Sequence, residues 1–239
     1  MKLDILAIGA HPDDVELSCG GTIITLVRQG HAVGLVDLTD GELGTRGTRE
    51  IRAAEAAEAA RIMGVAVREN LSLPDGGIEV NRDTTLKLIR VIRAYRPDVL
   101  IIPHSVDRHP DHEHAHALAR EAWFYAGLRK IETTHDGHLQ EPFRPRAYYH
   151  FMQWHEFSPS FILDVTGAYE TRLEAMRAFR SQFYDPASTE PETILSTPQF
   201  LEMIRTRLEY YGDKIGKKYG EPFFSPMAIH VPDLLRLNT

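Results

Sequence analysis

Short apolar runs alternate with longer stretches of helical periodicity through roughly the first hundred residues of this chain. The predicted strands are residues 3–10, 33–38, 65–71 and 98–103, and the predicted helices are residues 15–30, 48–63 and 81–95. Runs that are apolar on both faces are typical of strands that are covered on both sides. The alternation therefore predicts an α/β fold: a Rossmann-like, doubly wound, mainly parallel sheet with helices on both faces, formed by a single domain over residues 1–239.

The second half of the chain carries a weaker pattern. Residues 147–152 and 161–165 are predicted strands, and residues 168–183 and 198–211 are predicted helices. Between these two helices, residues 184–198 contain three prolines, which favours a long surface loop. Because long loops are often covers over functional sites, this segment is a candidate cover.

Charge and composition exclude several classes of function. A formal net charge of −7 disfavours nucleic-acid binding, which depends on Lys and Arg side chains that neutralise phosphates. The sequence shows neither a leader-like segment nor an apolar stretch of bilayer length, so we expect a cytoplasmic protein without a membrane partner. The lone Cys19 provides neither an internal disulfide nor a thiolate cage. Any metal site must therefore be built mainly from imidazoles and carboxylates.

Two clusters of His and Asp follow predicted strands. The sequence HPDD occupies residues 11–14, directly after the first strand, and DRHPDH occupies residues 107–112, shortly after the fourth. An Asp in a single strand-to-helix turn is more often a helix cap than a functional residue. In doubly wound sheets, however, ligands bind beyond the carboxyl ends of the strands, so both clusters are expected in one crevice.

The residue types in these clusters indicate a catalytic metal site. Two imidazoles and one carboxylate with open coordination positions form a familiar zinc arrangement, so we predict that Zn²⁺ is bound by His11, Asp14 and His112. Fe²⁺ is the alternative, because the same ligands suit both ions. Asp13 is then left as the general base that takes a proton from the attacking water and returns it to the leaving amine. His109 is predicted to stabilise the tetrahedral oxyanion, although a loop histidine bonded to nearby backbone explains it equally well.

Two other interpretations stay open. Residues 112–116 match the HExxH pattern of zinc peptidases, in which His112 and His116 share one helix face. We rank this lower because it leaves the HPDD cluster without a role. A non-catalytic sugar-binding module is a third hypothesis, which we rank lower still because no proposed ligand or base is missing.

Motifs spread over nearly the whole chain resemble those of the PIG-L/LmbE-like N-acetylglucosamine deacetylase family. They are AHPDDVELSCGGT at 10–22, DGELGTRGTREIRAAEA at 40–56, DRHPDHEHAH at 107–116, RSQF at 180–183 and KYGEPF at 218–223. The resemblance implies hydrolysis of the N-acetyl amide of a small amino-sugar conjugate. Within the family the chain looks most like the bacillithiol-pathway enzymes, which act on N-acetylglucosaminyl-malate. The resemblance also implies a homo-oligomer, either a trimer or a hexamer.

The resemblance also implies roles for individual residues. It gives the same metal ligands and the same base, and it places Arg52 and Arg108 near the substrate, where their planar guanidinium groups suit the carboxylates of malate. From the residues alone, Arg52 is a helix-surface charge paired with Glu55, and Arg108 is a loop charge paired with Asp107 or Asp111. Some family members also use a C-terminal tyrosine at the oxyanion, for which this sequence leaves three choices: Tyr184, Tyr210 and Tyr211.

Overall fold

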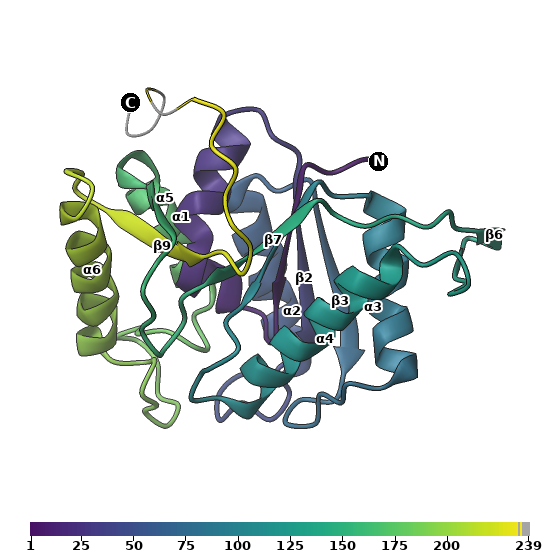
Figure 1. The fold of residues 1–239 in the computed structure, drawn as a ribbon. Helices are drawn as coiled ribbons and strands as arrows, with labels where there is room; N and C mark the ends of the chain where they lie inside the picture. Colours follow the sequence, from purple (N-terminus) through teal and green to yellow (C-terminus); the bar gives the residue numbers. More distant parts are fainter. Residues whose placement is uncertain (234, 236–239) are drawn as a thin grey trace.

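A seven-stranded sheet forms the centre of the structure (Figure 1). The computed structural model describes residues 1–233 and 235. The strand order is β3-β2-β1-β4-β7-β9-β8. The strands are β1 (Ile5–Gly9), β2 (Val33–Thr39), β3 (Val67–Leu73), β4 (Val99–Pro103), β7 (Ala147–Phe151), β8 (Phe161–Asp164) and β9 (Gly220–Phe224). The helices are α1 (Asp14–Arg28), α2 (Arg49–Met63), α3 (Arg82–Tyr95), α4 (Pro110–Ala126), α5 (Tyr169–Ala178) and α6 (Pro198–Asp213). The strands β3, β2, β1, β4 and β7 are parallel to one another. Strand β9 pairs with β7 in the antiparallel direction, and β8 pairs with β9 in the same way.

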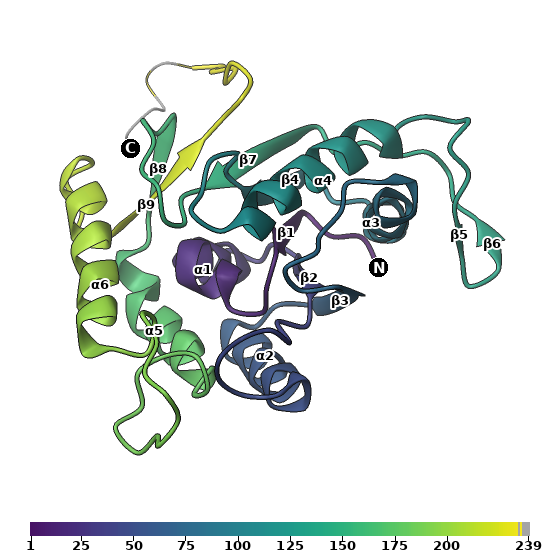
Figure 2. The same ribbon diagram turned by 90° about the horizontal axis from the view of Figure 1, so that it is seen from below.

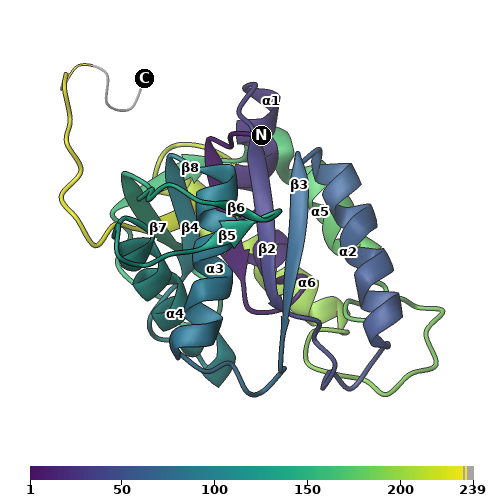
Figure 3. The same cartoon turned by 90° about the vertical axis from the view of Figure 1, so that its right-hand side faces the viewer.

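Alternate residues of the central strands supply two different cores. Leu6 and Ile8 of β1 pack in the core that α3 and α4 cover, whereas Ile5 and Ala7 pack in the core that α1 covers. Figure 3 shows α3 and α4 on one face of the sheet and α2 and α5 on the other. Because successive side chains of a strand point to opposite faces, burial on both faces requires the continuous apolar runs seen in the sequence. The predicted α/β fold class is confirmed.

The position of β1 brings the two His/Asp clusters together. Strand β1 pairs in parallel with β2 on one side and with β4 on the other, so that Ile5 lies opposite both Val33 and Val99. From β1 the chain adds β2 and β3 on one side of the sheet, and then crosses to the other side to add β4 and β7. The boundary between β1 and β4 is therefore the topological switch point of a doubly wound sheet. The segments that follow β1 and β4 therefore emerge side by side at the carboxyl edge.

Some predicted boundaries differ from the structure. The third strand spans Val67–Leu73 rather than residues 65–71, and the helix expected over residues 168–183 ends at Ala178. Beyond Ala178 the chain turns, and Phe179 and Phe183 pack with Phe200 of α6 in a separate core cluster. Tertiary packing thus ends this helix before its apolar pattern stops.

Three strands were missed by the sequence analysis. Strand β9 carries a proline and a glycine, which weaken a strand pattern. The two-residue strands β5 (Thr134–His135) and β6 (His138–Leu139) form a small hairpin that projects from the body of the molecule (Figure 2).

Within the described part of the chain, the structure contains no helix that is both long enough and apolar enough to cross a membrane.

Helix α1 is broken in its middle, at Cys19, which has non-helical dihedral angles (φ −144°, ψ 20°). The N–H groups that begin the second half belong to Gly21 and Thr22, and both donate to the carboxylate of Glu221 from β9, at 2.9 and 2.7 Å. A Cβ on Gly21 would lie only 2.8 Å from this carboxylate, so a glycine is required here. Glu221 thus caps the second half of α1.

Arg172 of α5 contacts the end of the first half of α1, just before the break. This guanidinium donates to the backbone carbonyls of Glu16 and Leu17 and forms an ion pair with Glu221 at 3.2 Å. Both side chains are almost completely buried. The Arg172–Glu221 pair therefore bonds backbone carbonyls before the break and backbone N–H groups after it, and it fixes the half-helix that begins at Asp14.

Candidate metal centre

The turn after β1 directs both of its carboxylates into the crevice. Asp13 has a positive φ of 119°, a left-handed conformation that is rare outside glycine and is often found at functional sites. Helix α1 begins at Asp14, whose Oδ2 accepts a hydrogen bond from the backbone N–H of His11 at 2.9 Å. Asp13 occupies the N-cap position, yet its side chain accepts no capping bond from the described residues. The structure therefore does not support the helix-cap interpretation of Asp13.

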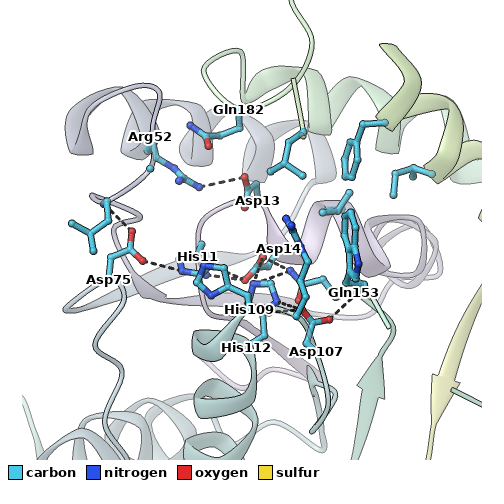
Figure 4. A pocket seen from close by; sticks show the side chains of 18 of the residues that line it. His11, Asp13, Asp14, Arg52, Asp75, Asp107, His109, His112, Gln153 and Gln182 are labelled. Atoms are coloured by element: carbon cyan, nitrogen blue, oxygen red, sulfur yellow. Dashed lines mark hydrogen bonds and ion pairs between the residues drawn. The ribbon is translucent and has the colours of Figure 1, made fainter. Parts of the chain in front are cut away.

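His11, Asp14 and His112 converge on one point (Figure 4). His11 Nδ1 lies 3.5 Å from Asp14 Oδ2, and His112 Nε2 lies 3.4 Å from Asp14 Oδ1. Ligand atoms that sit about 2.1 Å from a tetrahedral ion are separated from one another by about 3.4 Å. All three side chains are buried. Their donor types and spacing therefore fit a zinc-class cation, as the sequence predicts.

Each of the two imidazoles is also bonded to a further carboxylate. His11 Nε2 lies 3.0 Å from Asp75 Oδ1, and His112 Nδ1 lies 2.8 Å from Asp107 Oδ1. Carboxylates in this position orient metal-binding histidines and fix their tautomers. The sequence analysis missed Asp75 and treated Asp107 only as a partner of Arg108. The available signal was that Asp75 follows β3 at the same sheet edge.

The electrostatics of the cluster favour a bound positive charge. Burial lowers the pKa of His112, but the charge of Asp14 and a hydrogen bond with Asp107 raise it to about 9. Although burial opposes it, the charge of His112 and hydrogen bonds from both imidazoles hold the pKa of Asp14 well below its usual range. Without a cation, the imidazoles therefore hold protons to balance the carboxylates. A divalent cation would replace these protons when it binds.

Asp13 is paired with Arg52 of α2. Asp13 Oδ2 lies 3.3 Å from Arg52 Nη2, and the guanidinium also donates to the backbone carbonyls of Pro12 and Gly41. Burial raises the pKa of Asp13 to about 7, although the charge of Arg52 opposes this shift. Arg52 is buried and faces the cavity rather than Glu55, whose carboxylate accepts hydrogen bonds from Ser181. The interpretation of Arg52 as a helix-surface charge is therefore wrong.

His109 begins α4 and stacks on His112, with ring centroids 4.9 Å apart. Its Nδ1 accepts a hydrogen bond from the backbone N–H of Asp111 at 3.2 Å, so it caps the helix. Burial, together with the positive charges of His11 and His112, lowers its pKa. The neutral ring with Nδ1 as acceptor carries its proton on Nε2. His109 thus makes the predicted backbone bond through Nδ1, which leaves the N–H at Nε2 as its donor.

A cavity of about 260 Å³ opens over the cluster. Its polar wall is formed by the His/Asp cluster, and its other wall is apolar, formed by Leu17, Leu43, Trp154, Leu195, Phe200, Met203 and Ile204. Arg108 lies at this cavity with its guanidinium 4.0 Å from the centroid of the Trp154 ring. Among the described residues that line the cavity there is no tyrosine, so none of the three tyrosines considered from the sequence lies there. Leu195 belongs to the segment 184–198 that was predicted as a cover.

The HExxH residues do not assemble a second metal site of the peptidase type. His116 Nδ1 is bonded to the backbone carbonyl of Pro103 at 3.1 Å, and its ring packs 4.9 Å from His150. Glu113 accepts a hydrogen bond from the backbone N–H of Asp107. Two groups of described residues could hold a metal ion, and neither includes His116 or Glu113. The groups are His11–Asp14–His112, all buried, and His11–His109–Asp111.

Together the fold and the cluster define an α/β protein with a candidate metal centre at the switch point of its sheet. The sequence model of the PIG-L family, described as GlcNAc-PI de-N-acetylase, matches residues 6–123. The diacetylchitobiose deacetylase of Thermococcus kodakarensis is 30% identical over 227 residues, which cover 91% of this chain and 80% of that protein. The chain therefore belongs to the PIG-L family.

Two solved structures extend the comparison. The conserved protein TT1542 from Thermus thermophilus has a TM-score of 0.85 and 39% identity, covering 96% of this chain and 98% of that one. The N,N'-diacetylchitobiose deacetylase from Pyrococcus horikoshii has a TM-score of 0.79 and 29% identity, covering 92% and 82% of the two chains. Both similarities cover a much larger share of the chain than the family match over residues 6–123.

Proposed function

We propose that this protein is a metal-dependent deacetylase that hydrolyses the N-acetyl amide of an N-acetylglucosamine conjugate. The observation that carries the proposal is the convergence of His11, Asp14 and His112 at hydrogen-bonding separations, with a second buried carboxylate, Asp13, beside them. Family membership and the named activity of the two diacetylchitobiose deacetylases support the same reaction.

The cation, when bound, supplies Lewis-acid polarisation of the acetyl carbonyl and lowers the pKa of a coordinated water. Asp13 acts as the general base, since burial brings its pKa to about 7, near the range in which a base works best at neutral pH. It takes a proton from the attacking water and later delivers it to the amine that leaves. Arg52 acts through Asp13, because it holds the carboxylate at 3.3 Å and is itself fixed by two backbone carbonyls.

His109 stabilises the negative oxygen that develops on the acetyl carbon. Its Nδ1 is bonded to the backbone of α4, so its Nε2–H is the group left to donate into the cavity. A neutral imidazole donor fits the lowered pKa of this ring. The helix-capping bond and the catalytic role are therefore compatible, since they use different nitrogen atoms.

For the substrate we propose N-acetylglucosaminyl-malate, the conjugate that the sequence favours, with other N-acetylglucosamine conjugates as the alternative. Arg108 supports an anionic aglycone, because it lies at the cavity with its guanidinium stacked on Trp154. The contribution of Arg52 to carboxylate binding stays a prediction, since in the structure its donors bond Asp13 and the backbone. The apolar wall gives a sugar ring a surface on which to pack.

The test is acetate release by the zinc-loaded protein from malate-linked, inositol-linked, glucosamine-linked and free N-acetylglucosamine. We expect turnover of at least one conjugate, fastest for the malate conjugate, and loss of turnover in the Asp13→Asn variant. Absence of acetate release from every substrate, by folded protein loaded with zinc or with ferrous iron, would refute the deacetylase proposal. Faster turnover of another conjugate would refute only the malate assignment.

We also propose the homo-oligomer that the family resemblance implies. Light scattering of the purified protein would test whether it assembles as a trimer or a hexamer.

A further inference from the structure

Gln153 places its side-chain amide inside the proposed metal centre. This residue follows β7, the strand next to β4, and its side chain points into the His/Asp cluster (Figure 4). Its Nε2 donates to Asp14 Oδ1 and lies 3.2 Å from His112 Nε2. The amide N–H₂ group thus contacts two of the three atoms that are expected to bind the cation.

The other end of this amide is unsatisfied. Gln153 Oε1 is buried and has no hydrogen-bond partner among the described residues. Buried polar atoms almost always have a partner, and each exception requires an explanation. Gln153 is less than one-tenth exposed, so bulk water is not a ready partner for this oxygen. The exception is explained if the oxygen has a partner that binds only with the cation.

The amide lies beside His112 at a distance that two ligands of one ion can have. Its separation of 3.2 Å from His112 Nε2 is close to the ligand-to-ligand separation of about 3.4 Å around a tetrahedral zinc-class ion. A bound cation takes the carboxylate oxygen of Asp14 and replaces the proton on His112 Nε2, so the N–H₂ group has to leave both atoms. A half turn about the last side-chain bond exchanges the two amide atoms and presents Oε1 to the ion instead.

We propose that Gln153 is a fourth protein ligand of the cation in the substrate-free enzyme, through Oε1 after this half turn. The inference rests on the metal centre of the proposed function and extends it. A neutral amide oxygen is chemically the same donor as the acetamide oxygen of the substrate. Gln153 therefore occupies the substrate's coordination position until the acetyl group displaces it.

The test compares the zinc dissociation constants of the wild type and the Gln153→Leu variant by competition with a chromogenic chelator. Loss of a ligand is expected to weaken zinc binding at least as much as loss of a residue that only orients a ligand, which costs about tenfold or more. If Gln153 only competed with the cation for Asp14 and His112, its removal would instead tighten binding. A dissociation constant that is unchanged or lower in the variant therefore overturns the proposal.

Gln182→Leu is the matched control. Gln182 lines the same cavity on the side of Arg52, and its Nε2 donates to the backbone carbonyl of Arg46, so zinc affinity should not change. Thermal unfolding of the metal-free variants checks that both remain folded. A crystal structure of the zinc-loaded wild type should place Oε1 about 2.0–2.2 Å from the ion. An amide that stays out of contact in that structure would also overturn the inference, whereas failure of the wild type to bind zinc would overturn the metal centre itself.

Discussion

Replacing Glu221 with Ala tests whether the broken helix α1 depends on its buried ion pair. The carboxylate of Glu221 is fully buried and accepts hydrogen bonds from Gly21 and Thr22 in addition to its ion pair with Arg172 at 3.2 Å. The substitution leaves two backbone N–H groups and one guanidinium without this acceptor. Their surroundings exclude solvent, because the Arg172 side chain is also buried.

The expected cost follows from the loss of one partner of a buried pair. Such a loss destabilises a protein by about 3–5 kcal/mol, because the remaining charge is left buried without compensation. For a chain of this length, 1 kcal/mol lowers the melting temperature by about 2–4 °C. We therefore expect the melting temperature of Glu221→Ala to fall by about 6–20 °C.

Urea unfolding of the metal-free proteins measures the change in the free energy of unfolding. The control is Glu209→Ala, which removes a partially exposed ion pair with Arg205 on α6 and should cost less than about 1 kcal/mol. The double variant Arg172→Met, Glu221→Ala should be more stable than the sum of the two single losses predicts, since it removes both charges. If Glu221→Ala loses no more stability than Glu209→Ala, the proposed role of the pair in holding the two half-helices is refuted.

Three further predictions concern the metal centre. Asp107→Asn removes the charged acceptor of His112 and should weaken zinc binding by about 10–100-fold, as measured by chelator competition; an unchanged affinity would contradict an orienting role. His116→Ala should leave zinc affinity unchanged, whereas its loss in the same assay would favour the peptidase interpretation. In the metal-free protein, Asp13 keeps its proton up to a pKa of about 7, whereas the unfolded chain loses it near pH 4, so its contribution to stability falls as the pH rises between these values. Urea unfolding at several pH values should show a smaller decline for Asp13→Asn, and parallel curves for the two proteins would contradict the raised pKa.

The proximity of the two His/Asp clusters could be predicted from the sequence. Each cluster follows an apolar run, and the alternation of strands with helices indicates parallel strands whose carboxyl ends share one edge. This prediction needs only local information, namely the period of the apolar residues and the position of the polar residues that follow them. His11 and Asp14 could therefore be grouped with His112, although about a hundred residues separate His112 from them in the chain.

Contacts that depend on how distant elements pack could not be predicted in this way. Asp75 bonds His11 across 64 residues, Gln153 reaches Asp14 across 139, and Glu221 caps Gly21 across 200. No period or motif in the sequence links these pairs, because each distance is set by strand order, helix angle and the local direction of a side chain. The same reason explains Arg52: its local spacing indicated a pairing with Glu55, and the family resemblance implied a place near the substrate, but in the structure it pairs with Asp13.

The sequence by itself determined which residues are chemically able to bind a cation and at which edge of the sheet they lie, since strand polarity and residue type are local properties. Only the tertiary structure decided which groups surround them, orient them and compensate their charge. Those roles belong to side chains from other elements, and burial in a shared low-dielectric interior is what makes their interactions strong enough to matter.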